Sequence, residues 1–304
     1  MSNNLMLFRA SCGREIFYSY ERGSGLPVLF LNGLDDSLEV WRTLVHRLKD
    51  GRPRVFVDLI GQGASLERER QTGKEFVYEV GVEVQGQIVI ELLKKLSMET
   101  LDIVGNSYGA GVAIWMATQK SISAQKIILF NPFLLRLDLA FPLARVWSTQ
   151  YSLMKRWTPG VLSSPFRLIE RSYSRFIEKY MDHRFSFRIP DEELRAVKVQ
   201  LSKGIMQFNS FEYLNQLPEE SIFLFFSELD TLVPRALYLE FWFRLASSKK
   251  VICHQLMGGD HIILETAPQF VASRLELALM PMAKRDLRVK NISREFDLKS
   301  AEAI

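Results

Sequence analysis

One segment in the first half of the chain constrains the fold more than any other. An apolar run at residues 101–104 leads directly into Gly105-Asn106-Ser107-Tyr108-Gly109, and residues 109–115 continue with helical character. A strand that turns this sharply into a helix brings its backbone so close to neighbouring chain that only glycine fits beside the turn. The pattern predicts a strand, a strained turn and a helix, with the Ser107 hydroxyl held where a base can reach it. The alternative interpretation is an ordinary tight turn from strand to helix.

Short β-type runs alternate with longer helical patterns along most of the chain, after an opening antiparallel edge at residues 15–21. Strands are expected at residues 27–31, 54–58, 101–104, 126–130, 222–226 and 250–256, and helices at 37–49, 78–96, 234–246 and 267–279. Such alternation is typical of an α/β protein with a mostly parallel central sheet and helices on both faces.

The alternation is interrupted once. Residues 133–217 carry amphipathic helical patterns without a clear strand. We interpret this stretch as a helical lid inserted into an α/β core made of residues 1–132 and 218–284. Residues 285–304 are polar with mixed charge, and we expect a loosely attached tail there.

Composition and targeting signals exclude several classes of protein. A chain of 304 residues, 47% of them apolar, can bury a large core, and a net charge of +4 is too small to indicate a nucleic-acid partner. Neither a signal peptide nor an apolar run long enough for a transmembrane segment is evident, so we expect a soluble, cytoplasmic protein. Cys12 and Cys253 are expected to be reduced, core-type residues, and the few His and Cys residues lack metal-ligand spacing. No metal and no cofactor are expected.

A serine nucleophile needs a base, and the chain contains four histidines. His261 follows a predicted strand in Gly258-Gly259-Asp260-His261, where the glycines let the chain turn the side chain back over the sheet edge. His46 lies in a predicted helix, His254 in a predicted strand and His183 in the predicted lid, where packing or surface roles are expected. His261 is therefore the candidate base.

The base in turn needs a carboxylate, which fixes its tautomer and stabilises the imidazolium. Asp230 follows closely on the apolar run at residues 222–226. A carboxylate at the carboxyl end of a strand lies at the same rim of a parallel sheet as the turn at Ser107. Asp230 is therefore the candidate acid.

Other positions compete for the acid. Glu228 and Asp260 are rivals, of which Glu228 is the stronger, but it precedes the turn and should point differently. Asn131 and Pro132 close the strand at residues 126–130, which argues against an acid at that strand end.

The oxyanion that forms when a serine attacks a carbonyl group needs backbone N–H donors. Tyr108, directly after the serine, is expected to supply one at the positive end of a helix. The second is expected from Asn32-Gly33-Leu34, after the strand at residues 27–31, with the amide of Leu34 as the candidate. Asn32-Gly33 as a plain strand-to-helix turn is the alternative.

Taken in order, these elements resemble the α/β-hydrolase superfamily with a helical lid, over residues 9–282. The resemblance rests on residues 31–33, 58–65, 105–109, 228–234 and 259–261. It implies a catalytic triad in the chain order Ser107, Asp230, His261, and a serine where dehalogenases and epoxide hydrolases use an aspartate. The chain departs from the pattern at Asn32, where His is usual, and at Gln62, where His or Arg is common, so hydrogen bonding around the oxyanion loop is expected to differ.

The predicted lid carries an excess of cations. Between residues 133 and 189, ten Lys and Arg residues stand against four Asp and Glu residues, with aromatic residues interleaved. One interpretation is that the aromatic side chains pack the lid on the core while the cations form a solvated face. The other is a lid that shelters an apolar acyl chain and offers its cations to an acyl carrier or an anionic surface.

These features predict a serine hydrolase that cleaves a carboxylic ester or thioester of an apolar acyl group, with residues 133–217 contributing to substrate binding. The substrate would be a small molecule or a carrier-linked acyl ester, and nucleic acid is not expected as a partner. Two alternatives stay open. One is an acyltransferase that uses a hydroxyacyl thioester on the same triad, and the other is a ligand-binding receptor without turnover.

Overall fold

The computed structural model describes most of the α/β core and a small part of the predicted lid. The described residues are 5–34, 36–48, 50–72, 80–134, 197, 201–202, 204–205, 208–217, 221–233, 235–246 and 251–280. The predicted tail at residues 285–304 and most of the predicted lid, including His183, lie outside them.

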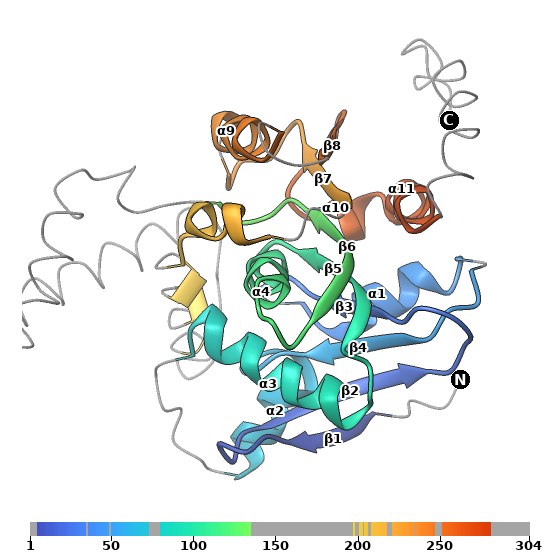
Figure 1. The fold of residues 1–304 in the computed structure, drawn as a ribbon, viewed down its shortest axis with the longest axis vertical. Helices are drawn as coiled ribbons and strands as arrows, with labels where there is room; N and C mark the ends of the chain where they lie inside the picture. The colour runs from blue at the N-terminus through green and yellow to red at the C-terminus, as the bar shows by residue number, and fades with distance from the viewer. Residues whose placement is uncertain are drawn as a thin grey trace, which may run out of the picture.

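An eight-stranded sheet forms the centre of the described part (Figure 1). Its strands lie in the order β1 (Met6–Arg9), β2 (Glu15–Glu21), β4 (Arg54–Asp58), β3 (Val28–Leu31), β5 (Thr100–Asn106), β6 (Ser123–Phe130), β7 (Ser221–Ser227) and β8 (Val251–Leu256). The β1–β2 and β2–β4 pairs are antiparallel and the other five are parallel. The predicted α/β class, with its antiparallel edge, is confirmed.

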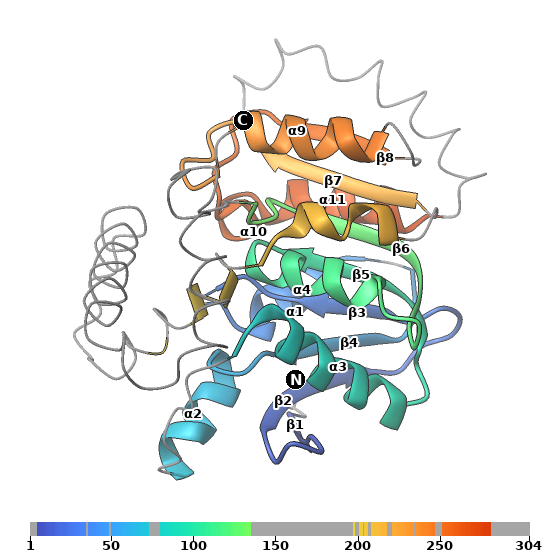
Figure 2. The same ribbon diagram turned by 60° about the vertical axis from the view of Figure 1, so that its left-hand side comes forward.

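Helices cover both faces of the sheet (Figure 2). They are α1 (Leu38–Val45), α2 (Gly63–Thr72), α3 (Val82–Lys95), α4 (Tyr108–Ala117), α9 (Arg235–Ala246), α10 (Ile263–Thr266) and α11 (Pro268–Leu279). Buried side chains of α3, α4 and α9 share one apolar cluster, and those of α1, α10 and α11 share a second. Alternate strand residues serve the two clusters, so Leu29 and Leu31 face one layer while Val28 and Phe30 face the other.

Some local predictions differ from the structure. Helix α2 was not predicted, because its residues are almost all polar and only Ser65 and Glu69 are buried. Cys12 is exposed in the turn between β1 and β2, so the expectation of a core position was wrong there, whereas Cys253 is half-buried; both are free thiols.

Part of the predicted lid belongs to the core where the structure describes it. Leu201, Ile205 and Phe208 are buried in the same apolar cluster as α3 and α4. Two short 3₁₀ turns, η1 (Ser210–Glu212) and η2 (Leu214–Gln216), then lead towards β7. The lid boundary at residue 217 stays a prediction.

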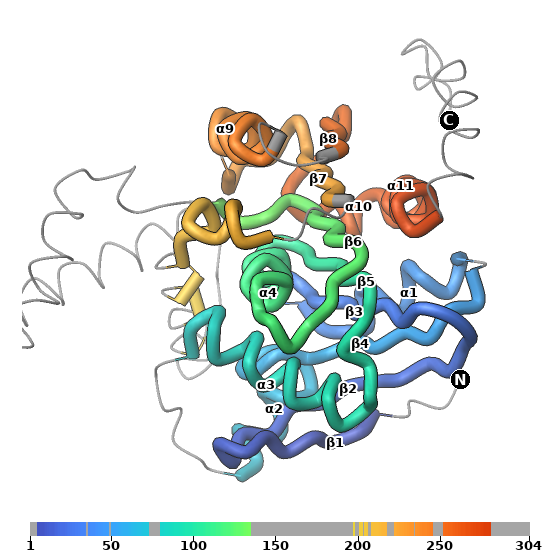
Figure 3. The backbone as a smooth tube through the Cα atoms, in the orientation of Figure 1, coloured from blue at the N-terminus to red at the C-terminus, as the bar shows by residue number. Residues whose placement is uncertain are grey.

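The parallel strands bring distant loops to one rim. Leu31 pairs with Gly105, Asn106 with Phe130, and Ser227 with Leu256. The loops that follow these strand ends therefore emerge at the same edge of the sheet, as the backbone trace shows (Figure 3). They carry the predicted triad residues Ser107, Asp230 and His261, and the predicted oxyanion residue Leu34.

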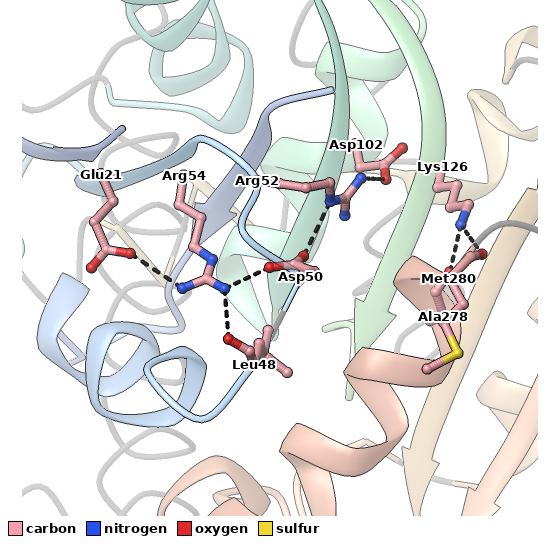
Figure 4. Close-up of polar contacts among 9 residues, drawn as sticks. All are labelled: Glu21, Leu48, Asp50, Arg52, Arg54, Asp102, Lys126, Ala278 and Met280. Carbon is pink, nitrogen blue, oxygen red and sulfur yellow. Dashed lines mark hydrogen bonds and ion pairs between the residues drawn. The ribbon is translucent and has the colours of Figure 1, made fainter. Parts of the chain in front are cut away.

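The opposite rim, at the amino ends of the strands, holds a network of ion pairs (Figure 4). Arg52 pairs with Asp102 at 2.7 Å and with Asp50 at 3.1 Å, and Arg54 pairs with Asp50 at 2.6 Å and Glu21 at 3.3 Å. Burial raises the pKa of Asp102 above its ordinary value, and the nearby Arg52 offsets only part of that rise.

Candidate active site

The turn between β5 and α4 has the strained geometry that the sequence predicts. Ser107 has φ 47° and ψ −109°, a left-handed conformation rare for residues with a side chain. A Cβ atom on Gly105 would lie 2.7 Å from the Cα of Ala110, and one on Gly109 would lie 2.5 Å from the carbonyl oxygen of Leu31. Any residue larger than glycine would force the backbone apart at both positions.

Neighbouring backbone groups hold the strained serine in place. The Ser107 N–H donates to the carbonyl of Phe130 at 3.0 Å. The Ser107 carbonyl accepts from the N–H groups of Ala110 at 3.2 Å and Phe133 at 3.3 Å. The end of β6 therefore supports the turn from the side, and the serine hydroxyl stays directed to the rim.

The structure brings Ser107, His261 and Asp230 together. Ser107 Oγ lies 2.8 Å from His261 Nε2, and His261 Nδ1 lies 2.8 Å from Asp230 Oδ2. A carboxylate only accepts, so Nδ1 carries the proton and Nε2 is left to accept the serine hydroxyl. The side chains of His261 and Asp230 are 11% and 1% exposed, which keeps this hydrogen-bonded chain away from bulk water.

The rival residues have other partners. Glu228 Oε2 accepts from the N–H of Gly258 at 3.0 Å, and Asp260 Oδ1 accepts from the hydroxyl of Thr266 at 3.1 Å. His254 stacks on Phe225 with ring centroids 5.3 Å apart. His46, the residue that caps the C-terminus of α1, contacts the carbonyl of Thr43 in that helix.

Asp230 is held by more donors than the sequence suggested. Its Oδ1 accepts from the N–H groups of Leu232 at 2.8 Å and Val233 at 3.0 Å, and its Oδ2 accepts from the Tyr238 hydroxyl at 2.6 Å. Burial raises the pKa of Asp230, but the hydrogen bonds and charge of His261, with the donors just named, outweigh burial and bring the pKa below its ordinary value. The carboxylate therefore stays ionised at neutral pH.

Tyr238 is a residue that sequence reasoning missed. It lies on α9, is fully buried and stacks on Phe226 with ring centroids 5.1 Å apart. Burial and the neighbouring charge of Asp230 raise the pKa of its hydroxyl well above the ordinary value, so it remains a donor. The sequence holds only a weak sign of this role. A tyrosine on the buried face of a helix needs a hydrogen-bond partner for its hydroxyl, but the neighbouring residues in the chain do not identify that partner.

The two predicted oxyanion donors belong to segments that adjoin the nucleophile. Tyr108 is the first residue of α4, and a Cβ atom on Gly33 would lie 3.5 Å from Ser107 Cβ, so the loop that carries Leu34 lies against the serine. In the part of the chain that the structure describes, neither the Leu34 nor the Tyr108 backbone N–H donates a hydrogen bond. Both amides stay candidates for the oxyanion role.

Comparison with known proteins identifies the family. A model of the alpha/beta hydrolase family matches residues 28–274, which is most of the chain. The chain belongs to the alpha/beta hydrolase family. Its predicted resemblance to that superfamily is confirmed.

Curated relatives of this alpha/beta hydrolase match over part of their length. A haloalkane dehalogenase from Agrobacterium fabrum is 28% identical over 121 residues, which cover 40% of this chain and 37% of that enzyme. A 2-hydroxymuconate semialdehyde hydrolase from a Pseudomonas species is 25% identical over 144 residues, covering 44% and 48%. The matches thus span less than half of either relative.

Solved structures share the fold over nearly the whole chain. The enol-lactonase from Burkholderia xenovorans superposes with a TM-score of 0.63 at 14% identity, covering 90% of this chain and 99% of that one. A hydrolase from Pseudomonas aeruginosa gives a TM-score of 0.61 at 16% identity, covering 92% and 100%. At this identity the likeness shows the fold alone.

The two departures from the superfamily pattern contact each other. The Asn32 Nδ2 donates to Gln62 Oε1 at 2.7 Å and to the carbonyl of Asp36 at 2.7 Å. Both amide side chains are buried. A buried pair of neutral amides therefore joins the Asn32-Gly33 loop to Gln62, at the two positions where the sequence departs from the superfamily pattern.

Two further observations concern the described residues as a whole. Within the described ranges, no helix is long and apolar enough to cross a membrane. The same ranges contain no group of three or more His, Cys, Asp or Glu side chains placed to hold a metal ion.

Proposed function

We propose that this alpha/beta hydrolase cleaves a carboxylic ester or thioester through an acyl-enzyme on Ser107. His261 Nε2 accepts the Ser107 proton as Oγ attacks the acyl carbonyl carbon, and the amides of Leu34 and Tyr108 stabilise the resulting oxyanion. The tetrahedral intermediate collapses, and His261 returns the proton to the leaving alcohol or thiol. Water then attacks the acyl carbon with His261 as base, which releases the acid and restores Ser107.

The observation that carries this proposal is the continuous hydrogen-bonded chain from Ser107 Oγ through His261 to Asp230, with 2.8 Å at each step. The strained φ of Ser107 holds its hydroxyl at the rim, and the low pKa of Asp230 keeps a negative charge against His261 when the imidazolium forms. A static binding site would need neither feature.

The identity of the nucleophile supports acyl transfer to serine over dehalogenation. Serine stands where the superfamily resemblance associates dehalogenases with aspartate, so the haloalkane dehalogenase among the relatives is a poor guide to the reaction. Phe133 and Leu134 are buried immediately after the loop that contacts the Ser107 backbone. Both side chains belong to the apolar core cluster next to the nucleophile, and the apolar acyl group itself stays part of the proposal.

The remaining expectations stay predictions. They are a small-molecule or carrier-linked substrate, an acyl carrier or anionic surface at the basic lid, substrate contacts from residues 133–217, and a cytoplasmic location. Most of the residues that would decide the lid's role lie outside the described ranges.

The test is product analysis with a chain-length series of p-nitrophenyl esters and a matched series of acyl thioesters, using Ser107→Ala as control. We expect free acid from the esters or thioesters, a preference for apolar chains, and no product from Ser107→Ala. An ester-linked dimer from a hydroxyacyl thioester would replace hydrolysis by acyl transfer. Tight binding of these substrates without any product would contradict the proposal in favour of a receptor.

A further inference from the structure

Asn131, at the end of β6, occupies a conformation that its place in the fold imposes. Its φ is 40°, in the left-handed region that Asn and Gly tolerate best, and the residue is fully buried. Its backbone N–H donates to the carbonyl of Phe225 in the neighbouring strand β7 at 2.8 Å. The strained backbone directs the side chain across the sheet edge.

The side-chain amide of Asn131 joins the end of β7 to the loop that carries His261. Its Oδ1 accepts from the N–H of Ser227 at 2.7 Å. Its Nδ2 lies 2.9 Å from Ser227 Oγ, 3.0 Å from the Asp260 carbonyl and 3.1 Å from the His261 carbonyl. The orientation of the amide is unambiguous, because a backbone N–H needs the oxygen and the two carbonyls need the nitrogen.

The residues next to Asn131 also support the serine. Phe130 and Phe133, on either side of Asn131, bond the N–H and the carbonyl of Ser107. The segment from 130 to 133 therefore touches the backbone at both ends of the 2.8 Å contact between Ser107 Oγ and His261 Nε2. The loop between β8 and α10, which carries His261 and is called the base loop below, contains Gly258, with φ 68°, and Gly259. Because glycines leave a backbone flexible, this loop needs contacts from outside to hold His261 in place.

We infer that Asn131 is a positioning residue, whose amide donors fix the base loop and so set the distance between Ser107 and His261. The inference rests on the proposed function, since it assumes that this contact activates Ser107. A displacement of about 1 Å in such a contact lowers a rate by roughly 10²-fold.

Two substitutions separate the amide from the backbone strain. Asn131→Gly keeps the left-handed conformation without a steric clash and removes the amide. Asn131→Asp keeps the side-chain shape but replaces the donor by an oxygen that faces the Asp260 and His261 carbonyls. Ser65→Ala is the matched control, because Ser65 is also fully buried and bridges the Phe17 N–H and the Asp58 carbonyl, in another layer of the protein.

The experiment measures the rate of labelling by a fluorophosphonate, kcat and KM on the best ester, and thermal stability for all four proteins. We expect labelling and kcat to fall about 10- to 100-fold in both Asn131 variants, with KM changed less than about threefold. Ser65→Ala should lose about as much thermal stability as the Asn131 variants while labelling at the wild-type rate.

The outcomes distinguish the two proposals. If the wild type labels but both Asn131 variants label equally fast, the positioning role is wrong and the proposed function stands. If Asn131→Asp alone retains full labelling, the amide donors are not needed and the inference also fails. If the folded wild type does not label at all, the proposed function fails first. Should one Asn131 variant not fold, the other still decides.

Discussion

The two rims of the central sheet are built on different physical principles. At the amino ends of the strands, Arg52, Arg54, Asp50 and Asp102 pair with one another, and each charge has an opposite charge within 3.1 Å (Figure 4). At the carboxyl ends, the Asp230 carboxylate is held by hydrogen bonds from four groups, which are two backbone N–H groups, the Tyr238 hydroxyl and the His261 ring.

Backbone strain follows the same division. Of the three non-glycine residues with left-handed backbone among those described, Ser107 and Asn131 lie at the carboxyl-end rim. A strained backbone conformation persists only where many surrounding contacts hold it, and such residues cluster at active sites, where the reaction needs that geometry. Substitutions of the triad residues at the carboxyl-end rim should therefore change rates far more than stability, whereas substitutions at the amino-end rim should change stability at constant rate.

The largest expected effect is that of Ser107→Ala. Removing the nucleophile should lower kcat by roughly 10⁶-fold, as in other serine enzymes of this mechanism. Because only a hydroxyl is lost, the melting temperature should stay close to that of the wild type. Steady-state kinetics with a parallel thermal melt checks both parts, and substantial residual turnover would remove Ser107 from the reaction.

Asp230→Asn should have the next largest effect on kcat. An amide of the same shape cannot stabilise the imidazolium and favours the wrong tautomer of His261, so kcat should fall roughly 10⁴-fold with the fold retained. The rival carboxylates provide the control: Glu228→Gln should leave kcat within a few-fold of the wild type. A near-wild-type rate for Asp230→Asn would refute the assignment of the acid.

Tyr238→Phe should have an intermediate effect. The ring still stacks on Phe226, but Asp230 loses one donor, which should lower kcat about tenfold, the equivalent of about 1.4 kcal/mol. Losing this donor raises the pKa of Asp230, so activity should decline at a higher pH than in the wild type as the solution is acidified. Tyr18→Phe, on β2 at the opposite edge, is the control, and an unchanged pH–rate profile for Tyr238→Phe would count against the role of this hydroxyl.

Arg52→Met should show the reverse behaviour at the other rim. It leaves the buried Asp102 without its 2.7 Å partner, which should lower the free energy of unfolding by about 2–4 kcal/mol while kcat is unchanged. The pKa of Asp102, already raised by burial, rises further, so the loss should shrink as the pH falls and the carboxyl is protonated.

The control for this substitution is Arg9→Met. Arg9 is 68% exposed, and its partner Glu15 keeps a second ion pair with Arg68 at 3.4 Å, so the loss of Arg9 should cost less than about 1 kcal/mol. Denaturant titrations at neutral and acidic pH measure both variants. A reduced kcat in Arg52→Met at unchanged stability would break the division between the two rims.

The sequence was informative where a residue's role is set by its near neighbours in the chain. The turn at Ser107 is signalled by glycines two residues away on each side, and His261 and Asp230 follow closely on apolar runs that became β8 and β7. The predicted strand bounds at 15–21 and 54–58 agree with the structure, because both segments are followed by turn or loop residues that end the β-type pattern.

The sequence did not predict roles that depend on contacts between residues far apart in the chain. Asn131 and Ser227 are 96 positions apart, and their hydrogen bonds follow from the pairing of β6 with β7, which no local pattern specifies. Asn131 entered the sequence argument only as a reason against an acid at that strand end. Helix α2 was missed for a different reason, since its polar surface gives no amphipathic signal.

Activation of Ser107 is tested by intact-protein mass spectrometry after incubation with a fluorophosphonate, on the wild type and Ser107→Ala in parallel. We expect one adduct per wild-type chain and none on Ser107→Ala, because the contact between Ser107 and His261 activates that hydroxyl alone. A folded wild-type protein that gains no adduct, or an adduct that persists in Ser107→Ala, would contradict it.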